Sequence, residues 1–134
     1  MSKIVYPSKE KIIELNALIL TVIKVKKADK SEVLSHAKLN NLLEDCINHE
    51  GDLHDKAVIL MKLLIKSHAF ASGNRRTAFI VTKHFVTQNK GKFKIQDDPS
   101  YANVMQGIRE NHYSTDEIKE WITNGKIKPF KRRL

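Results

Sequence analysis

The chain has little of what crosslinks a protein or anchors it in a membrane. Cys46 is the single cysteine among 134 residues, so no internal disulfide can form. Because a lone free cysteine is typical of reducing compartments, we expect a cytoplasmic protein. The longest apolar runs, such as residues 15–25, are interrupted by polar side chains and are too short to span a bilayer. Residues 1–7 lack the charged-then-apolar order of a secretion signal, so we expect no leader.

Glycine and proline are also scarce, with five and three residues respectively, and no internal repeat is visible. Long stretches without helix breakers carry apolar residues at three- and four-residue spacing, which predicts an all-α fold. The length suits one domain. We therefore expect a compact bundle of about six helices over residues 1–125, followed by a basic tail, residues 126–134, that is frayed or bound by a partner and adds nothing to the core.

The N-terminal part of the chain predicts two amphipathic helices. The first begins after Ser8, whose hydroxyl suits an N-cap, and the second spans about residues 35–49. Their apolar stripes follow the helical repeat and are expected to face the core. The positions predicted to be buried are Ile12, Leu15, Ile19, Val22, Ile23, Leu39, Leu42, Leu43, Cys46 and Ile47.

The remaining helices differ in how much of their surface is apolar. The segment 53–70 is apolar on nearly all sides, which predicts a helix in the middle of the bundle, and a second central helix follows over about 75–89. Pro99 suits the first turn of a fifth helix. The spacing of Ser114 and Glu117 is that of a capping box and predicts the start of the last helix.

Positive charge predominates, with a formal net charge of +9. This balance favours a polyanionic partner, such as nucleic acid, a nucleotide or an acidic protein, or serves only to keep the protein in solution. The basic runs at 24–27 and 131–133 are the candidates for nucleic-acid contacts. Neither is accompanied by a helix-turn-helix dimer signature or a platform of aromatic residues, so we interpret both as solvated charge.

One segment between the two central helices carries a pattern suited to chemistry. His68 precedes a tight turn centred on Gly73, and a new helix opens with Arg75 and Arg76. A helix start presents unpaired N–H groups and partial positive charge, and a glycine beside it lets an anion approach the backbone. Two arginines there oppose the helix dipole unless an anion offsets them. The pattern favours a phosphate site with a histidine at its rim; the alternative is a simple turn between two helices.

These residues resemble a known family. The family signature reads His-x-Phe-x-(Asp/Glu)-Gly-Asn-Gly-Arg, and residues 68–78 read His-Ala-Phe-Ala-Ser-Gly-Asn-Arg-Arg-Thr-Ala. An apolar helix leads into the histidine, and residues 39–44 (Leu-Asn-Asn-Leu-Leu-Glu) look like the segment that precedes the motif helix in Doc proteins. The chain is thus similar to the Fic/Doc family of death-on-curing-like toxins over about residues 4–123, which implies the family's helical bundle with the motif loop between two central helices.

The resemblance implies a role for each motif residue. His68 is the general base that takes a proton from a hydroxyl of the target, a task suited to histidine because it exchanges protons near neutral pH. Phe70 is the inward-facing anchor of the loop, and Arg76 completes the catalytic set by gripping a phosphate. Gly73 and Asn74 form the anion hole. The residues assigned to nucleotide and phosphate binding are Ser72, Gly73, Asn74, Arg75, Arg76 and Thr77.

The resemblance leaves two reactions open, both using ATP as substrate. Most Fic enzymes transfer AMP to a protein hydroxyl, whereas Doc-like proteins transfer the γ-phosphoryl group to elongation factor Tu. Members that transfer AMP have glycine at the position of Arg75, whereas Doc-like members have a basic residue there. Arg75 therefore favours phosphoryl transfer to a protein such as a translation factor. A catalytically silent interaction module and a basic nucleic-acid-binding protein remain the alternatives.

Ser72 is the main departure from the family pattern. Family members usually carry an acidic residue here that helps to hold Mg²⁺, whereas serine offers a neutral oxygen and is at most a weak metal ligand. We therefore expect Mg²⁺ to arrive bound mainly to the nucleotide phosphates, and activity to be reduced. The inhibitory (Ser/Thr)-x-x-x-Glu-(Gly/Asn) string of many Fic proteins is not found, because Cys46 stands where its Ser or Thr would precede Glu50. A separate antitoxin chain is the expected restraint.

Overall fold

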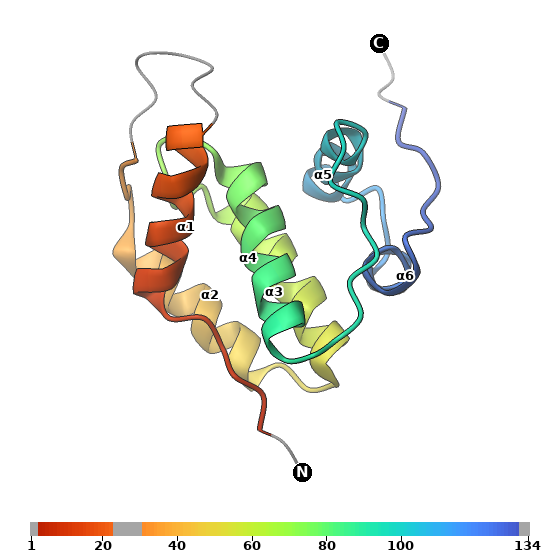
Figure 1. The fold of residues 1–134 in the computed structure, drawn as a ribbon, viewed down its shortest axis with the longest axis horizontal. Helices are drawn as coiled ribbons and strands as arrows, with labels where there is room; N and C mark the ends of the chain where they lie inside the picture. Colours follow the sequence, from red (N-terminus) through yellow and green to blue (C-terminus); the bar gives the residue numbers. More distant parts are fainter. Residues whose placement is uncertain (1–2, 23–30, 132–134) are drawn as a thin grey trace.

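The computed structural model describes residues 3–22 and 31–131, and within them the predicted all-α fold is confirmed (Figure 1). Some of the predictions concern residues outside the described part of the chain, namely Ile23, the basic run 24–27 and the basic residues 132 and 133. The helices are α1 (Lys9–Val22), α2 (His36–Asn48), α3 (Leu53–Ser67), α4 (Asn74–Gln88), α5 (Tyr101–Arg109) and α6 (Thr115–Asn124).

The two longest helices, α3 and α4, pack against each other in the middle of the bundle (Figure 1). Helix α1 packs on α4 and α2 packs on α3, whereas α5 and α6 cover α3 from the other side. Side chains on most faces of α3 are buried, as its all-round apolar sequence predicts. This arrangement places the turn between α3 and α4 at one end of the bundle, close to both α1 and α5.

The two predicted caps, at Ser8 and Ser114, are present, and the structure adds a cap at Ser35. The Ser8 hydroxyl accepts the Lys11 N–H at 3.0 Å, and the Ser35 hydroxyl accepts the Lys38 N–H at 3.1 Å. Ser114 and Glu117 form the capping box that their spacing indicates. Such caps satisfy backbone donors that a helix start otherwise leaves unpaired, and each is typically worth about 1 kcal/mol. Local sequence therefore determines where these helices begin.

Predictions about burial and helix starts were wrong at three positions and met only in part at a fourth. Val22 and Ile47 are exposed, with 74% and 47% of their surface accessible, because the periodic pattern does not tell how far the neighbouring helices extend. Leu43 is only half-buried. Pro99 lies in a turn before α5 and not in its first helical turn.

The helix predicted over residues 53–70 also ends earlier than its apolar pattern indicates. Helix α3 stops at Ser67, because His68 takes a left-handed conformation with φ 54° and ψ 43° and forms the C-cap. A residue in this region turns the chain out of the helix. Ala69 and Phe70 are buried as the pattern predicts, but they belong to the loop that leads to α4.

The chain after α6 contributes to the core, contrary to the predicted detached tail. Ile127 and Phe130 pack against the core cluster. The Tyr113 hydroxyl donates to the carbonyl oxygen of Lys128 at 2.8 Å, and the Phe130 N–H donates to the side chain of Asn103. The basic composition of the chain end gave no indication that its two apolar side chains reach the bundle.

No helix in the described part of the chain is long and apolar enough to cross a membrane.

Candidate functional site

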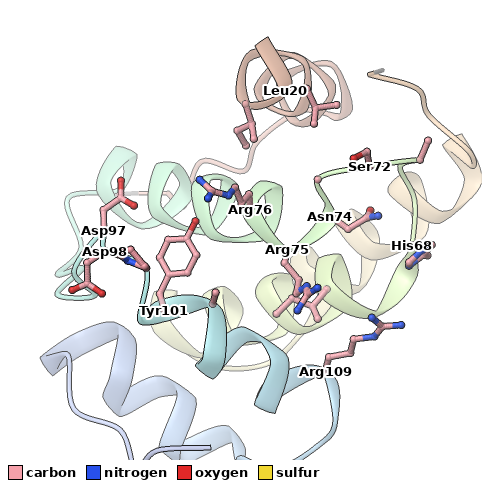
Figure 2. Close-up of a pocket in the computed structure, with 16 residues that line it drawn as sticks. Leu20, His68, Ser72, Asn74, Arg75, Arg76, Asp97, Asp98, Tyr101 and Arg109 are labelled. Atoms are coloured by element: carbon pink, nitrogen blue, oxygen red, sulfur yellow. The ribbon is translucent and has the colours of Figure 1, made fainter. Parts of the chain in front are cut away.

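A cavity of about 710 Å³ opens where the α3–α4 turn meets α1 and α5 (Figure 2). Ile19 and Leu20 of α1 supply apolar lining, and the start of α5 forms the opposite wall. Its size is within the range of small-molecule and nucleotide sites. The polar and charged residues that line it are His68, Ser72, Asn74, Arg75, Arg76, Asp97, Asp98, Tyr101 and Arg109.

The loop that ends at this cavity is held by backbone pairing with the segment before α2. Val33 and Phe70 form an isolated antiparallel bridge. The Leu34 N–H donates to the carbonyl oxygen of Ala69 at 2.7 Å, and the Ala71 N–H donates to that of Glu32 at 2.9 Å. With Phe70 fully buried beneath the bridge, the exposed His68 is held at the rim of the cavity.

The side chain of Asn74 closes the loop from the inside. Its Oδ1 accepts the Phe70 N–H at 3.1 Å, and its Nδ2 donates to the Phe70 carbonyl oxygen at 2.8 Å. Both amide groups are therefore used within the loop. The side chain of Asn74 thus helps to hold the loop, and the residue itself is the first of α4, at the uncapped helix start.

Asn16 is the residue that sequence reasoning missed. It lies fully buried on α1, where its Nδ2 donates to the Ser72 carbonyl oxygen at 3.0 Å and to the Thr77 hydroxyl at 2.9 Å. Its Oδ1 accepts from the Ser31 hydroxyl at 3.1 Å. A buried amide that uses both ends in this way ties three separate segments together. A polar residue in an otherwise apolar helix face was the available signal.

Thr77 does not occupy the phosphate-binding position that we predicted for it. Its side chain is fully buried, and its hydroxyl accepts the bond from Asn16. Its N–H donates to the Gly73 carbonyl oxygen at 2.8 Å, which is the first bond of α4. Thr77 therefore positions the loop and does not line the cavity, whose lining ends at Arg76 on this helix.

The start of α4 is open to the cavity. Gly73 is its N-cap, in a left-handed conformation with φ 75°, and no side chain caps this end. A Cβ at Gly73 would lie 3.2 Å from Leu20 and 3.4 Å from the Asn16 amide nitrogen, so both the conformation and the packing favour glycine. Unpaired N–H groups in a first helical turn, together with the helix dipole, are groups that can attract an anion.

The two arginines of the motif point to opposite sides of this helix start (Figure 2). Arg76 lies near Tyr101, whose pKa is raised by burial, lowered in part by the positive charge of Arg76 and raised by the negative charge of Asp97. Arg75 points toward α5, where it donates to the side-chain oxygen of Gln106. The cavity thus has a positive side chain on either flank of the anion site.

Ser72 and the acidic residues of the cavity lie apart from each other. Asp97 and Asp98 occupy the end near Tyr101, whereas Ser72 lies beside α1 (Figure 2). The pKa of Asp98 is lowered by hydrogen bonds from the Ser100 hydroxyl and N–H, so this carboxylate caps the turn before α5. No cluster of three potential metal ligands of the His, Cys, Asp or Glu type occurs among residues 3–22 and 31–131.

The helical bundle and its site define an α-helical domain with an uncapped helix start in a cavity and a histidine at the rim of that cavity. A family model described as the Fic/DOC family matches residues 6–86, more than half of the chain. The protein belongs to the Fic/DOC family. Members of this family are typically ATP-dependent transferases that modify proteins. A comparison with curated proteins returned no match to the chain.

The matched range ends within α4, so α5 and its contribution to the cavity lie beyond it. Asp97, Asp98, Tyr101 and Arg109 line the cavity from this later part of the chain. The sequence alone did not mark any of these four residues as part of a site. Their contribution depends on how α5 packs beside α4, and no local motif marks it.

Proposed function

We propose that the protein is an ATP-dependent transferase that phosphorylates a hydroxyl group on a target protein. The observation that carries this proposal is the uncapped start of α4 inside a cavity with His68 on its rim. The anion site suits the phosphates of ATP, and the cavity is large enough to admit more than a single phosphate. A translation factor is the target class that the Doc resemblance favours.

In the proposed reaction, His68 takes the proton of the target hydroxyl as its oxygen attacks the γ-phosphorus of ATP. A new oxygen–phosphorus bond forms, the bond between the γ-phosphorus and the bridging oxygen breaks, and ADP leaves. Phosphoryl transfer requires mainly positioning and charge stabilisation. The N–H groups at the start of α4 and the Arg75 and Arg76 side chains supply positive charge on three sides of the phosphates.

Transfer of AMP to a protein hydroxyl is the second candidate reaction. What favours phosphoryl transfer is the place of Arg75, whose guanidinium lies on the α5 flank of the cavity (Figure 2). His68 and Arg109 line the same cavity as Arg75, and in the view of Figure 2 all three side chains are drawn on the side of the cavity away from Asp97 and Asp98. Positive charge on that flank draws the outer phosphates of ATP toward the base, so that the γ-phosphorus is the one within its reach.

The two reactions are separated by the position of the label that reaches a target. Incubation of the protein with cell lysate and γ-labelled ATP is expected to label a protein band, and α-labelled ATP is expected to leave the same band unlabelled. Label from α-labelled ATP would assign AMP transfer instead. Label from neither nucleotide would favour the silent interaction module, and salt-dependent binding of DNA or RNA would favour a nucleic-acid-binding protein.

Mg²⁺ fits this site only as an ion carried mainly by the nucleotide. Ser72 offers one neutral hydroxyl oxygen, and hard divalent ions prefer carboxylates and phosphates. When bound, Mg²⁺ neutralises developing phosphate charge. In the proposed arrangement the chain's own residues act on the phosphates directly: the α4 N–H groups orient them, and Arg75 and Arg76 balance their charge.

Replacing Ser72 by aspartate is expected to raise the rate of transfer about tenfold at low Mg²⁺, because a carboxylate restores one charge-assisted ligand contact. The rate is measured as label transferred per minute across a Mg²⁺ titration, and the Mg²⁺ concentration at half-maximal rate should fall. Ser72→Asn is the matched control, because asparagine is similar in size to aspartate but neutral. This variant should behave like the wild type. An aspartate variant with an unchanged Mg²⁺ dependence would show that position 72 does not contact the metal.

Antitoxin control of this site is proposed on the family resemblance. The family includes toxins, and the inhibitory string of many Fic proteins does not occur in the sequence. A separate protein chain that covers the cavity would restrain the activity, in keeping with the Doc resemblance.

A further inference from the structure

Helix α5 turns one face, which carries Gln106 and Arg109, toward the cavity. Ala102 and Arg109 line the cavity directly, and Gln106 lies between them at helical spacing and contacts Arg75. Residues spaced by four and three positions lie on one face of a helix, so these side chains point the same way. This face lies beyond residues 6–86, the part of the chain that the family model covers.

Arg75 is held against this face by a chain of hydrogen bonds. Its guanidinium donates to the Gln106 side-chain oxygen, and the Gln106 amide nitrogen donates to a Glu110 carboxylate oxygen at 3.0 Å. The glutamine is therefore oriented at both ends, with its oxygen turned toward Arg75. This orientation keeps the guanidinium on the α5 flank of the cavity, although Arg75 belongs to α4.

Arg109 lies one turn further along α5, on the same flank. Its exposed side chain lines the same cavity as Arg75 and His68, and Figure 2 draws it on their side of the cavity. Within the described part of the chain it forms neither a hydrogen bond nor an ion pair. A guanidinium has five N–H donors and does not lose its charge in proteins, so the donors of Arg109, which no described residue engages, are open to solvent and to an anionic ligand in the cavity.

We propose that Arg109, together with Arg75, forms a second phosphate subsite that binds the outermost phosphate of a nucleoside triphosphate beside His68. This inference rests on the proposed function, because it takes the cavity to be the nucleotide site. The α4 start holds one phosphate through its N–H groups, and the two guanidinium groups receive the end of the chain of phosphates. Arg109 is thus a specificity-determining residue that separates triphosphates from monophosphates.

A simpler role for Arg109 is stabilisation of its own helix. A positive side chain in the last turn interacts favourably with the helix dipole, and Arg109 occupies that turn. This role predicts a small loss of thermal stability when the charge is removed and no change in nucleotide affinity. The two roles therefore differ in a binding measurement and not only in a melting curve.

The test is isothermal titration calorimetry on the full chain in Mg²⁺ buffer, with AMP and with an ATP analogue that cannot be cleaved at its γ-phosphate. Arg109→Gln is expected to weaken binding of the ATP analogue at least about tenfold, because a charge-assisted hydrogen bond is lost. Binding of AMP, which lacks the outer phosphates, is expected to stay unchanged. Arg109→Lys keeps the charge without the planar fork. Its affinity for the ATP analogue should therefore lie between those of the wild type and Arg109→Gln.

Lys38→Gln on the exposed start of α2 is the matched control, because it removes the same charge away from the cavity and should change neither affinity. Arg109→Gln with wild-type affinity for the ATP analogue would overturn the inference and leave the proposed function standing. Equal weakening of the ATP analogue and AMP would overturn it as well, since the side chain would then not act on the outer phosphate. A wild-type chain that binds neither nucleotide would contradict the proposed function itself.

Discussion

Replacement of His68 by alanine is expected to reduce transfer of label from ATP to the target by about 10²–10⁴-fold, the usual contribution of a positioned general base. The side chain is exposed at the cavity rim and forms no part of the core, so the variant should fold normally. Affinity for the nucleotide should not change, because the α4 start and the two arginines remain. Label transfer and calorimetry on the same preparation measure the two effects separately.

His36→Ala provides the control for this variant, since His36 is also an exposed histidine at a helix end but does not line the cavity. It should transfer label at the wild-type rate. If His68→Ala kept the wild-type rate of transfer, the histidine would not be the base, and the proposed mechanism would be wrong. If His68→Ala instead lost nucleotide binding, the imidazole would belong to the binding site and not to proton transfer.

Replacement of Asn16 by alanine is expected to lower both stability and activity. The change removes the donor for the Ser72 carbonyl oxygen and for the buried Thr77 hydroxyl, and each buried group left unpaired costs about 1–3 kcal/mol. We expect a loss of about 2–4 kcal/mol, which corresponds to a fall in melting temperature of roughly 10 °C for a domain of this size. At temperatures where the variant is still folded, the rate of transfer should fall about 10- to 100-fold, because the loop then loses its fixed place beside α1.

Asn40→Ala is the matched control, because Asn40 lies exposed on α2 and its replacement should change stability by less than about 0.5 kcal/mol. Thermal melting by circular dichroism and label transfer at a temperature where both variants are folded measure the outcome. An Asn16→Ala variant with wild-type melting and wild-type transfer would show that the bonds from α1 do not position the motif loop. Lower stability with unchanged transfer would limit the role of Asn16 to folding.

Much of the fold was predictable because it depends on local pattern. Apolar spacing and the scarcity of glycine and proline predicted an all-α fold, and the caps at Ser8 and Ser114 predicted helix starts that the structure confirms. The errors concern positions where a neighbouring element decides the outcome. Val22 follows the apolar stripe of α1 and is nevertheless exposed, whereas Phe130 lies in a basic tail and nevertheless packs on the core.

The candidate site divides in the same way. The motif from His68 to Arg76 is contiguous, so its turn, its glycine and its helix start could be found by reading along the chain. Asn16 could not be recognised as its clamp, because the two are far apart in sequence and a buried asparagine has no meaning until its partners are known. The same holds for Arg109, which becomes a cavity residue only when α5 packs beside the motif.

By itself, the sequence determined the helical class of the fold, the family and the position of the motif, because periodicity, capping and a contiguous signature are all properties of neighbouring residues. Only the tertiary structure decided what the motif residues do with their side chains. It assigned Thr77 and the side chain of Asn74 to holding the loop, turned Arg75 toward α5 and brought Arg109 to the cavity. The physical reason is that hydrogen bonds and charges act across space, between segments whose distance along the chain says nothing of their contact.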